Sequence, residues 1–271
     1  MEIRLKKKRG KDWPLKDEPL RNPGQSLDEQ IADLIDTAVM WTIAVGIFGT
    51  ATLFRWIDWY APPPWPPQKP IFLTVIFGAL FACAWWKAHR IMKKVRRVKL
   101  GRAGEKAVGQ ELEKLCARGY RVFHDILADK FNVDHVIIGP GGIFAVETKT
   151  RSVPRGKRAE VRFDGQKLTC NGKTMDRDPI KQAKAQAVWI HDILEESTGR
   201  SYFVKPVLVF PGWWVAPTEN NLHDLWVLNP KALPSFIEIE PKKLSDEDIK
   251  LATYHLSRYI RASERYARIR L

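Results

Sequence analysis

The chain has 271 residues, with 45 Lys or Arg against 31 Asp or Glu, so its formal net charge at pH 7 is +14. This length allows one sizeable domain and something smaller beside it. Only three cysteines are present, Cys83, Cys116 and Cys170, and they are scattered. That spacing argues against a structural zinc site and fits a reducing compartment better than a disulfide framework.

Residues 1–36 form a polar segment that is rich in turn residues as far as Gln25. Ser26 is a suitable N-cap for a short amphipathic helix that continues to Ile35. We expect this N-terminal segment to be cytoplasmic and assign no chemistry to it.

Residues 37–86 contain two apolar runs, Thr37–Phe54 and Ile71–Trp86, neither with a charged residue. A membrane-spanning helix needs about 20 apolar residues, with a range of about 17 to 25. The loop between the runs carries Pro62–Pro64 and Pro66–Pro67 and cannot be helical throughout. We predict two transmembrane helices, at about 37–54 and 71–86. The alternative is that both runs are buried core helices of a soluble protein.

A basic block follows the second run, and we expect residues 87–100 to be a juxtamembrane linker. The positive-inside rule places this side in the cytoplasm, and a two-span hairpin returns both termini there. No signal peptide is visible. The block is also suited to contact anionic headgroups or nucleic-acid phosphates. Its members are Lys87, Arg90, Lys93, Lys94, Arg96, Arg97, Lys99 and Arg102.

Residues 101–271 alternate between helical and strand patterns. A helix over Gly101–Ala117 precedes a strand and a hairpin whose two faces are both apolar, which predicts an α/β sandwich with helices on both sides of a sheet. Further helices are expected to start at Asp178–Pro179 and at Ser245, the latter reaching about Ile260. The expected strands are 121–126, 132–139, 143–150, 160–163, 167–170, 205–210 and 225–228.

The hairpin carries the most informative side chains. A type II turn centred on Pro140 and Gly141 would place Asp134 opposite Glu147, with Cβ atoms about 5 Å apart. Two adjacent carboxylates repel unless a proton or cation lies between them. Lys149 follows Glu147 by two residues, on the same face of the strand. This arrangement predicts a divalent-metal site for phosphodiester chemistry; the alternative is a surface salt bridge at a strand end.

These residues resemble the PD-(D/E)xK nuclease superfamily, and specifically its nuclease-related domain (NERD), from about Gly101 to Leu194. The matching segments are Gly101–Glu105, Val133–Val136, Val146–Lys149 and Asp178–Pro179 with Gln182. The resemblance implies a restriction-endonuclease-like mixed sheet flanked by helices. It also implies that Asp134 and Glu147 bind Mg²⁺ or Mn²⁺, that Lys149 orients or activates the attacking water, and that Glu105 and Gln182 support the site.

Other interpretations exist for several of these residues. Near a helix start, Glu105 is favoured by the helix dipole whatever its function, and a lone Gln182 is usually a surface residue. His135 lies on the face opposite Asp134 and is expected to be a core histidine. The basic loop after Lys149 and the Trp213–Trp214 pair are either ordinary surface and packing or a lip that contacts nucleic acid.

The sequence therefore predicts a multi-pass protein of the bacterial inner membrane with a metal-dependent, nuclease-like domain on the cytoplasmic side. Its expected partners are DNA or RNA and the lipid bilayer, and the sequence does not identify protein partners. The alternative is a catalytically silent, membrane-tethered module that binds nucleic acid or supports assembly.

Overall fold

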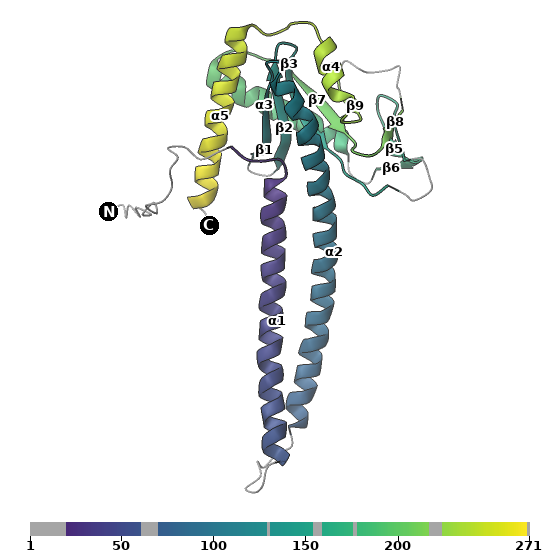
Figure 1. Cartoon of the computed structure of the whole chain (residues 1–271), viewed down its shortest axis with the longest axis vertical. Helices are drawn as coiled ribbons and strands as arrows, with labels where there is room; N and C mark the ends of the chain where they lie inside the picture. Colours follow the sequence, from purple (N-terminus) through teal and green to yellow (C-terminus); the bar gives the residue numbers. More distant parts are fainter. Residues whose placement is uncertain are drawn as a thin grey trace, which may run out of the picture.

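A computed structural model describes residues 20–60, 70–128, 131–153, 159–175, 178–216 and 224–269. Two long helices, α1 (Gln25–Tyr60) and α2 (Ile71–Cys116), run side by side and project from an α/β domain (Figure 1). The domain lies at one end of this pair, and the last residues of α1 and the first residues of α2 lie at the other end (Figure 1).

The apolar parts of α1 and α2 are exposed. Almost none of either apolar stretch is buried, and side chains such as Met40, Ile47, Phe72 and Trp85 are 66% to 75% exposed. Core helices of a soluble protein would bury these side chains, so that alternative does not describe the structure. Both helices are long and apolar enough to cross a membrane. The proline-rich residues 61–69 lie outside the described residues.

Helix α2 is continuous across the expected linker. Residues 87–100 are helical, and the helix that was expected to begin at Gly101 begins instead at Ile71. No proline interrupts this stretch, and its Lys, Arg and Ala residues are good helix formers. In the same way the short helix expected at Ser26 is the first part of α1. The expected domain boundary at residue 101 therefore lies inside a helix.

A five-stranded mixed sheet forms the centre of the domain, in the order β1-β2-β3-β7-β9. Strands β1, β2 and β3 pair antiparallel, whereas β3, β7 and β9 pair parallel. The expected α/β architecture is confirmed. The strands are β1 (Arg121–Leu127), β2 (Asn132–Gly139), β3 (Gly142–Thr148), β7 (Val204–Val209) and β9 (Trp226–Leu228).

Helices cover both faces of this sheet. On one face, α3 (Pro179–Thr198) and α5 (Asp246–Ile269) share a core with side chains of β2 and β3. On the other face, the last turns of α2 and the short α4 (Leu233–Ile239) form a second core. A smaller sheet, in the order β6-β5-β4-β8, lies beside them and contributes a third apolar cluster. Its strands are β4 (Glu160–Phe163), β5 (Leu168–Cys170), β6 (Lys173–Thr174) and β8 (Trp214–Val215).

The β2–β3 hairpin has the expected register but not the expected turn. Gly139 pairs with Gly142, and Val136 pairs with Ala145. A type II turn would need a positive φ at Gly141, but the positive φ, of 130°, is at Gly142. Gly142 is the residue that needs glycine's conformational freedom here, so the prediction of a type II turn was wrong.

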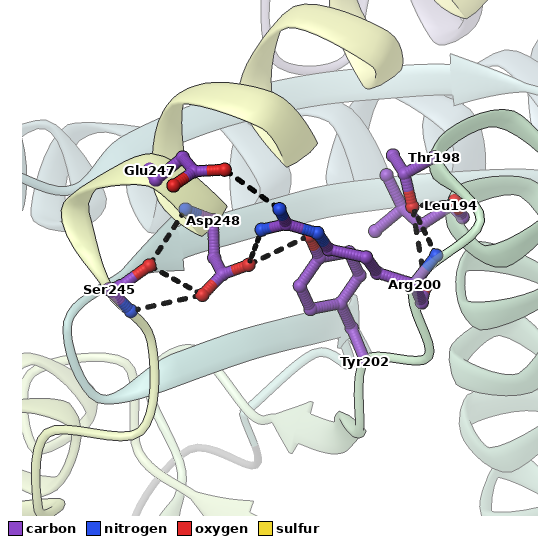
Figure 2. A network of polar contacts seen from close by, with 7 residues as sticks. All are labelled: Leu194, Thr198, Arg200, Tyr202, Ser245, Glu247 and Asp248. Atoms are coloured by element: carbon purple, nitrogen blue, oxygen red, sulfur yellow. Dashed lines mark hydrogen bonds and ion pairs between the residues drawn. The ribbon is translucent and has the colours of Figure 1, made fainter.

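Helix α3 starts as predicted, because Asp178 accepts a hydrogen bond from the backbone N–H of Lys181 and Pro179 occupies the first turn. Its far end is tied to α5. The Arg200 guanidinium donates to Glu247 and Asp248, and Asp248 also caps α5 together with Ser245 (Figure 2). Helix α5 runs to Ile269 rather than about Ile260. These contacts fix the position of α3 over the sheet.

Two histidines meet inside the domain. His135 of β2 is completely buried, and its Nδ1 lies 2.8 Å from Nδ1 of His124 on β1. His135 is therefore the core histidine expected from the sequence. Burial lowers the pKa of His135 well below its usual value, with His124 adding to the effect, and burial also lowers the pKa of His124.

This pair predicts a loss of stability in acid. The folded chain keeps both rings neutral, whereas the unfolded chain takes up protons below a pKa of about 6.5. Stability should therefore be intact above pH 6.5 and fall below it, by up to about 1.4 kcal/mol per pH unit for each histidine. Urea unfolding of the full chain in detergent at pH 7.5 and 5.5 measures this. H135N should reduce the pH dependence relative to the wild-type chain, and an unchanged slope in H135N would contradict the assignment.

Candidate functional site

Glu147, near the end of β3, is the centre of a polar cluster. Its side chain is almost completely buried, and β3 holds it by pairing Glu147 with Leu208 of β7. Glu147 Oε1 forms an ion pair with the Lys149 ammonium and accepts a hydrogen bond from Gln182 Nε2 at 2.8 Å. Glu147 Oε2 accepts from Gln186 Nε2 at 2.6 Å. A buried carboxylate needs such partners, and this one receives them from β3 and α3.

Lys149 is positioned by both its backbone and its side chain. Its backbone N–H donates to the carbonyl of Val209 at 2.9 Å, which extends the β3–β7 pairing beyond the strand. Its ammonium donates to Glu147 and, at 2.7 Å, to Gln182 Oε1. The side chain is 23% exposed, so the ammonium is fixed in place but can still be reached from solvent.

Asp134 enters the cluster from β2. The β2–β3 ladder ends at the pair His135–Val146, one pair before the expected partners Asp134 and Glu147. Asp134 Oδ2 instead accepts the backbone N–H of Thr148 at 2.7 Å. Burial, then the charge of Glu147, then that of Glu105 raise the pKa of Asp134 well above its usual value. Asp134 is mostly buried but keeps some exposed surface, and its carboxyl group would gain from a nearby cation.

Glu105 joins from the opposite face of the sheet. It lies far inside α2 rather than near a helix start, so the helix-dipole explanation was wrong. Burial first, then the charges of Asp125 and Glu147, raise the pKa of Glu105 to about 8. The neighbouring Gly104 allows this approach, because a Cβ there would lie 1.7 Å from Thr150 Oγ1. The Gly-x-x-Gly-Glu segment thus brings α2 against the end of β3.

The segment before α1 also supports this region, which the sequence did not predict. Asp125 of β1 is buried with a positive φ of 50°. It accepts hydrogen bonds from Arg21 Nε at 2.9 Å and from the backbone N–H of Ser26 at 2.6 Å. A Cβ on Gly24 would lie 3.5 Å from Glu105 Oε2. Residues 20–28 are therefore part of the domain, and a chain starting at residue 101 would leave Asp125 buried without these partners.

All five residues predicted from the sequence are electrostatically or directly linked at this end of β3, but one participant was missed. Gln186 is buried and joins Glu147 to the backbone carbonyl of Asn132 at 2.9 Å. Gln182 and Gln186 are four residues apart and therefore project from one face of a helix. That spacing is the signal that could have identified Gln186 beside Gln182.

Residues beyond Lys149 lie near the small sheet. Trp213 is buried and donates from Nε1 to the carbonyl of Arg151 at 3.1 Å, whereas Trp214 is about half exposed. Packing therefore explains Trp213, and the alternative of an aromatic lip is reduced to Trp214. Arg155, Lys157 and Arg158 of the expected basic lip lie outside the described residues.

A family model covers the part of the chain that carries these residues. Residues 100–211 match the family model of the nuclease-related domain, NERD. The match extends from α2, shortly before Glu105, to the residues just after β7, so it includes every predicted site residue. The mixed sheet with helices on both faces is consistent with the nuclease-like α/β fold of a NERD domain.

A similar curated protein is an uncharacterized protein of Bacillus anthracis, which is 32% identical over 81 residues. The alignment covers 28% of this chain and 38% of that protein, so the chain spans well under half the length of this relative. No solved structure matches the chain.

Proposed function

We propose that this protein is a membrane-anchored, metal-dependent nuclease whose NERD segment hydrolyses phosphodiester bonds of DNA or RNA. The main support is the convergence of Asp134, Glu147 and Glu105 beside the single ammonium of Lys149. Neighbouring carboxyl groups help to raise the pKa values of Asp134 and Glu105. A nearby cation would favour the ionised forms of both groups, and in a nuclease of this type that cation is Mg²⁺ or Mn²⁺.

The donor set fits Mg²⁺ better than a metal held entirely by protein. Among the described residues, no group of three or more His, Cys, Asp or Glu is placed to hold a metal ion. Mg²⁺, however, is commonly bound by one or two carboxylates together with water and substrate phosphates. Asp134 and Glu147 are the two residues that would hold the ion. Glu105 would support these two ligands from α2, on the opposite face of the sheet.

The surrounding residues have separate tasks in this proposal. A bound divalent ion would polarise the phosphate and lower the pKa of a coordinated water. The Lys149 ammonium orients that water and offsets the charge that develops on the phosphate oxygens. Gln182 fixes both Lys149 and Glu147, and Gln186 holds the second oxygen of Glu147. α3 therefore aligns the site and leaves the reacting groups to β2 and β3.

One observation favours the alternative of a silent nucleic-acid-binding module. Both oxygens of Glu147 are already engaged by Lys149, Gln182 and Gln186. If those contacts persisted with nucleic acid bound, the carboxylate would have little capacity left for a metal ion.

Cleavage by the purified full chain in detergent separates the two functions. Labelled single- and double-stranded DNA and RNA should be cleaved with Mg²⁺ or Mn²⁺, but not with EDTA and not by E147Q. Tight binding of any of these substrates without cleavage under all metal conditions would decide for the silent module.

The membrane anchor has its own test. We propose that α1 and α2 cross the bacterial inner membrane as a hairpin, with both termini and the NERD segment in the cytoplasm. The exposed apolar surface of both helices and the basic residues after Trp86 support this topology. Reporter fusions placed after Trp65 and after Leu271 should report opposite sides, with the second in the cytoplasm. A chain that is soluble and monomeric without detergent would exclude the hairpin.

A further inference from the structure

A basic hollow lies on α2 directly beyond its apolar stretch. Its volume is about 440 Å³, and α2 alone supplies its lining. We call it the α2 hollow; its lining residues are Trp86, His89, Arg90, Lys93, Lys94 and Arg97. Their spacing of three and four residues places all six on one face of the helix.

This face is turned away from α1. Ala84, Ala88 and Ile91 line the space shared with α1, and Val95, one turn further along, is almost completely buried. At 3.6 residues per turn these positions lie on the opposite side of α2 from Arg90 and Arg97. The hollow therefore does not serve the pairing of the two helices, and its side chains are exposed.

The α2 hollow carries positive charge without a compensating acid. No acidic residue occurs between Lys87 and Arg102. In the described part of the chain, none of the ion pairs involves Arg90, Lys93, Lys94 or Arg97. Four cations on one helix face repel one another unless an anion neutralises them.

Aromatic contacts indicate where that anion lies. The Arg90 guanidinium lies 3.8 Å from the centre of the Trp86 ring, and the Lys87 ammonium lies 3.9 Å from the centre of the Trp41 ring. Tryptophan favours the boundary between hydrocarbon and water, and flanking Lys and Arg side chains extend toward headgroups. The hollow thus begins at the end of the apolar stretch and continues for about three helical turns toward the domain.

We propose that the α2 hollow binds the headgroup of an anionic phospholipid from the leaflet next to the domain. The inference rests on the proposed membrane anchor but not on nuclease activity. A nucleic-acid phosphate is also an anion and could be attracted by the same cations. Trp86 at one end of the hollow and the adjoining apolar surface favour a lipid, because the acyl chains of a lipid can contact both. Arg90, Lys94 and Arg97 contact the headgroup, and Trp86 packs against the upper part of the chains.

Native mass spectrometry of the full chain in detergent tests this, using phosphatidylglycerol and phosphatidylcholine with identical acyl chains. Wild type should retain phosphatidylglycerol at least about tenfold more strongly, because each cation near an anionic headgroup contributes to the attraction. The triple variant R90Q/K94Q/R97Q should lose this preference. K167Q/K231Q/K250Q removes the same charge from exposed lysines of the α/β domain and should keep it.

Three outcomes would overturn the proposal. They are equal retention of both lipids by wild type, unchanged preference in R90Q/K94Q/R97Q, and an equal loss in the control variant. If the second of these is accompanied by a loss of binding of a single-stranded oligonucleotide, the hollow is assigned to nucleic acid instead. Because lipid retention is measured without substrate or metal, its failure is distinguishable from a failure of nuclease activity. If the full chain is instead soluble and monomeric without detergent, the proposed membrane anchor is itself contradicted.

Discussion

Replacing Lys149 with alanine is expected to lower the rate of phosphodiester cleavage by about 100- to 1,000-fold, the usual effect of removing one preorganised electrostatic contact to a reacting centre. The Lys149 ammonium is held by Glu147 and Gln182 at the end of β3, where it faces the position proposed for the attacking water. Affinity for nucleic acid should fall only slightly, because one phosphate contact among several contributes a small part of binding.

The matched control for this variant is K181A. Lys181 is a largely exposed lysine in the first turn of α3, next to Gln182 in sequence, so it tests the loss of one positive charge near the site. Single-turnover cleavage and oligonucleotide affinity should both be measured for the two variants. A K149A protein that cleaves at the wild-type rate, or that loses affinity and rate in equal proportion, would contradict the proposed role.

Replacing Asp134 with asparagine is expected to have two opposite effects. Binding of Mn²⁺ should weaken by about 100-fold or more, since loss of a direct ligand exceeds the effect typical of outer contacts. The metal-free chain should nevertheless become more stable. Burial and the charges of Glu147 and Glu105 raise the pKa of Asp134, so the folded state binds more protons at this group than the unfolded state does. The free energy of unfolding therefore falls as the pH rises from the ordinary pKa of an aspartate toward the raised pKa of Asp134 in the folded chain. Asparagine does not ionise and removes this loss of stability.

D178N provides the same chemical change as a control, because Asn and Asp are equally good helix N-caps. It should not change Mn²⁺ affinity. Titration calorimetry with Mn²⁺ and urea unfolding in EDTA between pH 5 and 8 measure the two effects. Unchanged Mn²⁺ binding in both D134N and E147Q would remove these residues as ligands. A less stable D134N in EDTA would show that Asp134 acts mainly through its hydrogen bond from Thr148.

The hairpin part of the site was predictable because it depends on local geometry. Alternation along β2 and β3 and one tight turn are enough to bring Asp134, Glu147 and Lys149 to the same end of the sheet. The other contributions depend on residues far apart in sequence. The approach of Glu105 requires a glycine at position 104 against Thr150, and the partners of Asp125 come from residues about 100 positions earlier. Periodicity within one segment contains no information about such contacts.

The length of α2 was also beyond prediction from periodicity. The helix crosses from an apolar stretch with no polar face, through a basic stretch, into an amphipathic end that packs on the sheet. Each part has a different pattern of apolar and polar residues, so the sequence pattern changes at two places where the helix continues. Only the absence of proline from Ile71 to Cys116 indicates continuity, whereas the change from apolar to basic residues at Trp86 predicts a boundary.

On the proposed topology, the unbroken α2 makes the distance between bilayer and site a fixed property of the chain. From Trp86 to Glu105 the helix rises roughly 28 Å, at about 1.5 Å per residue. It also sets the direction in which the site opens, because each inserted residue would turn the domain by about 100° relative to the membrane. A substrate would then reach the site only if it can approach the membrane closely enough and from the correct side. Such selection depends on the shape of the substrate rather than on its nucleotide sequence.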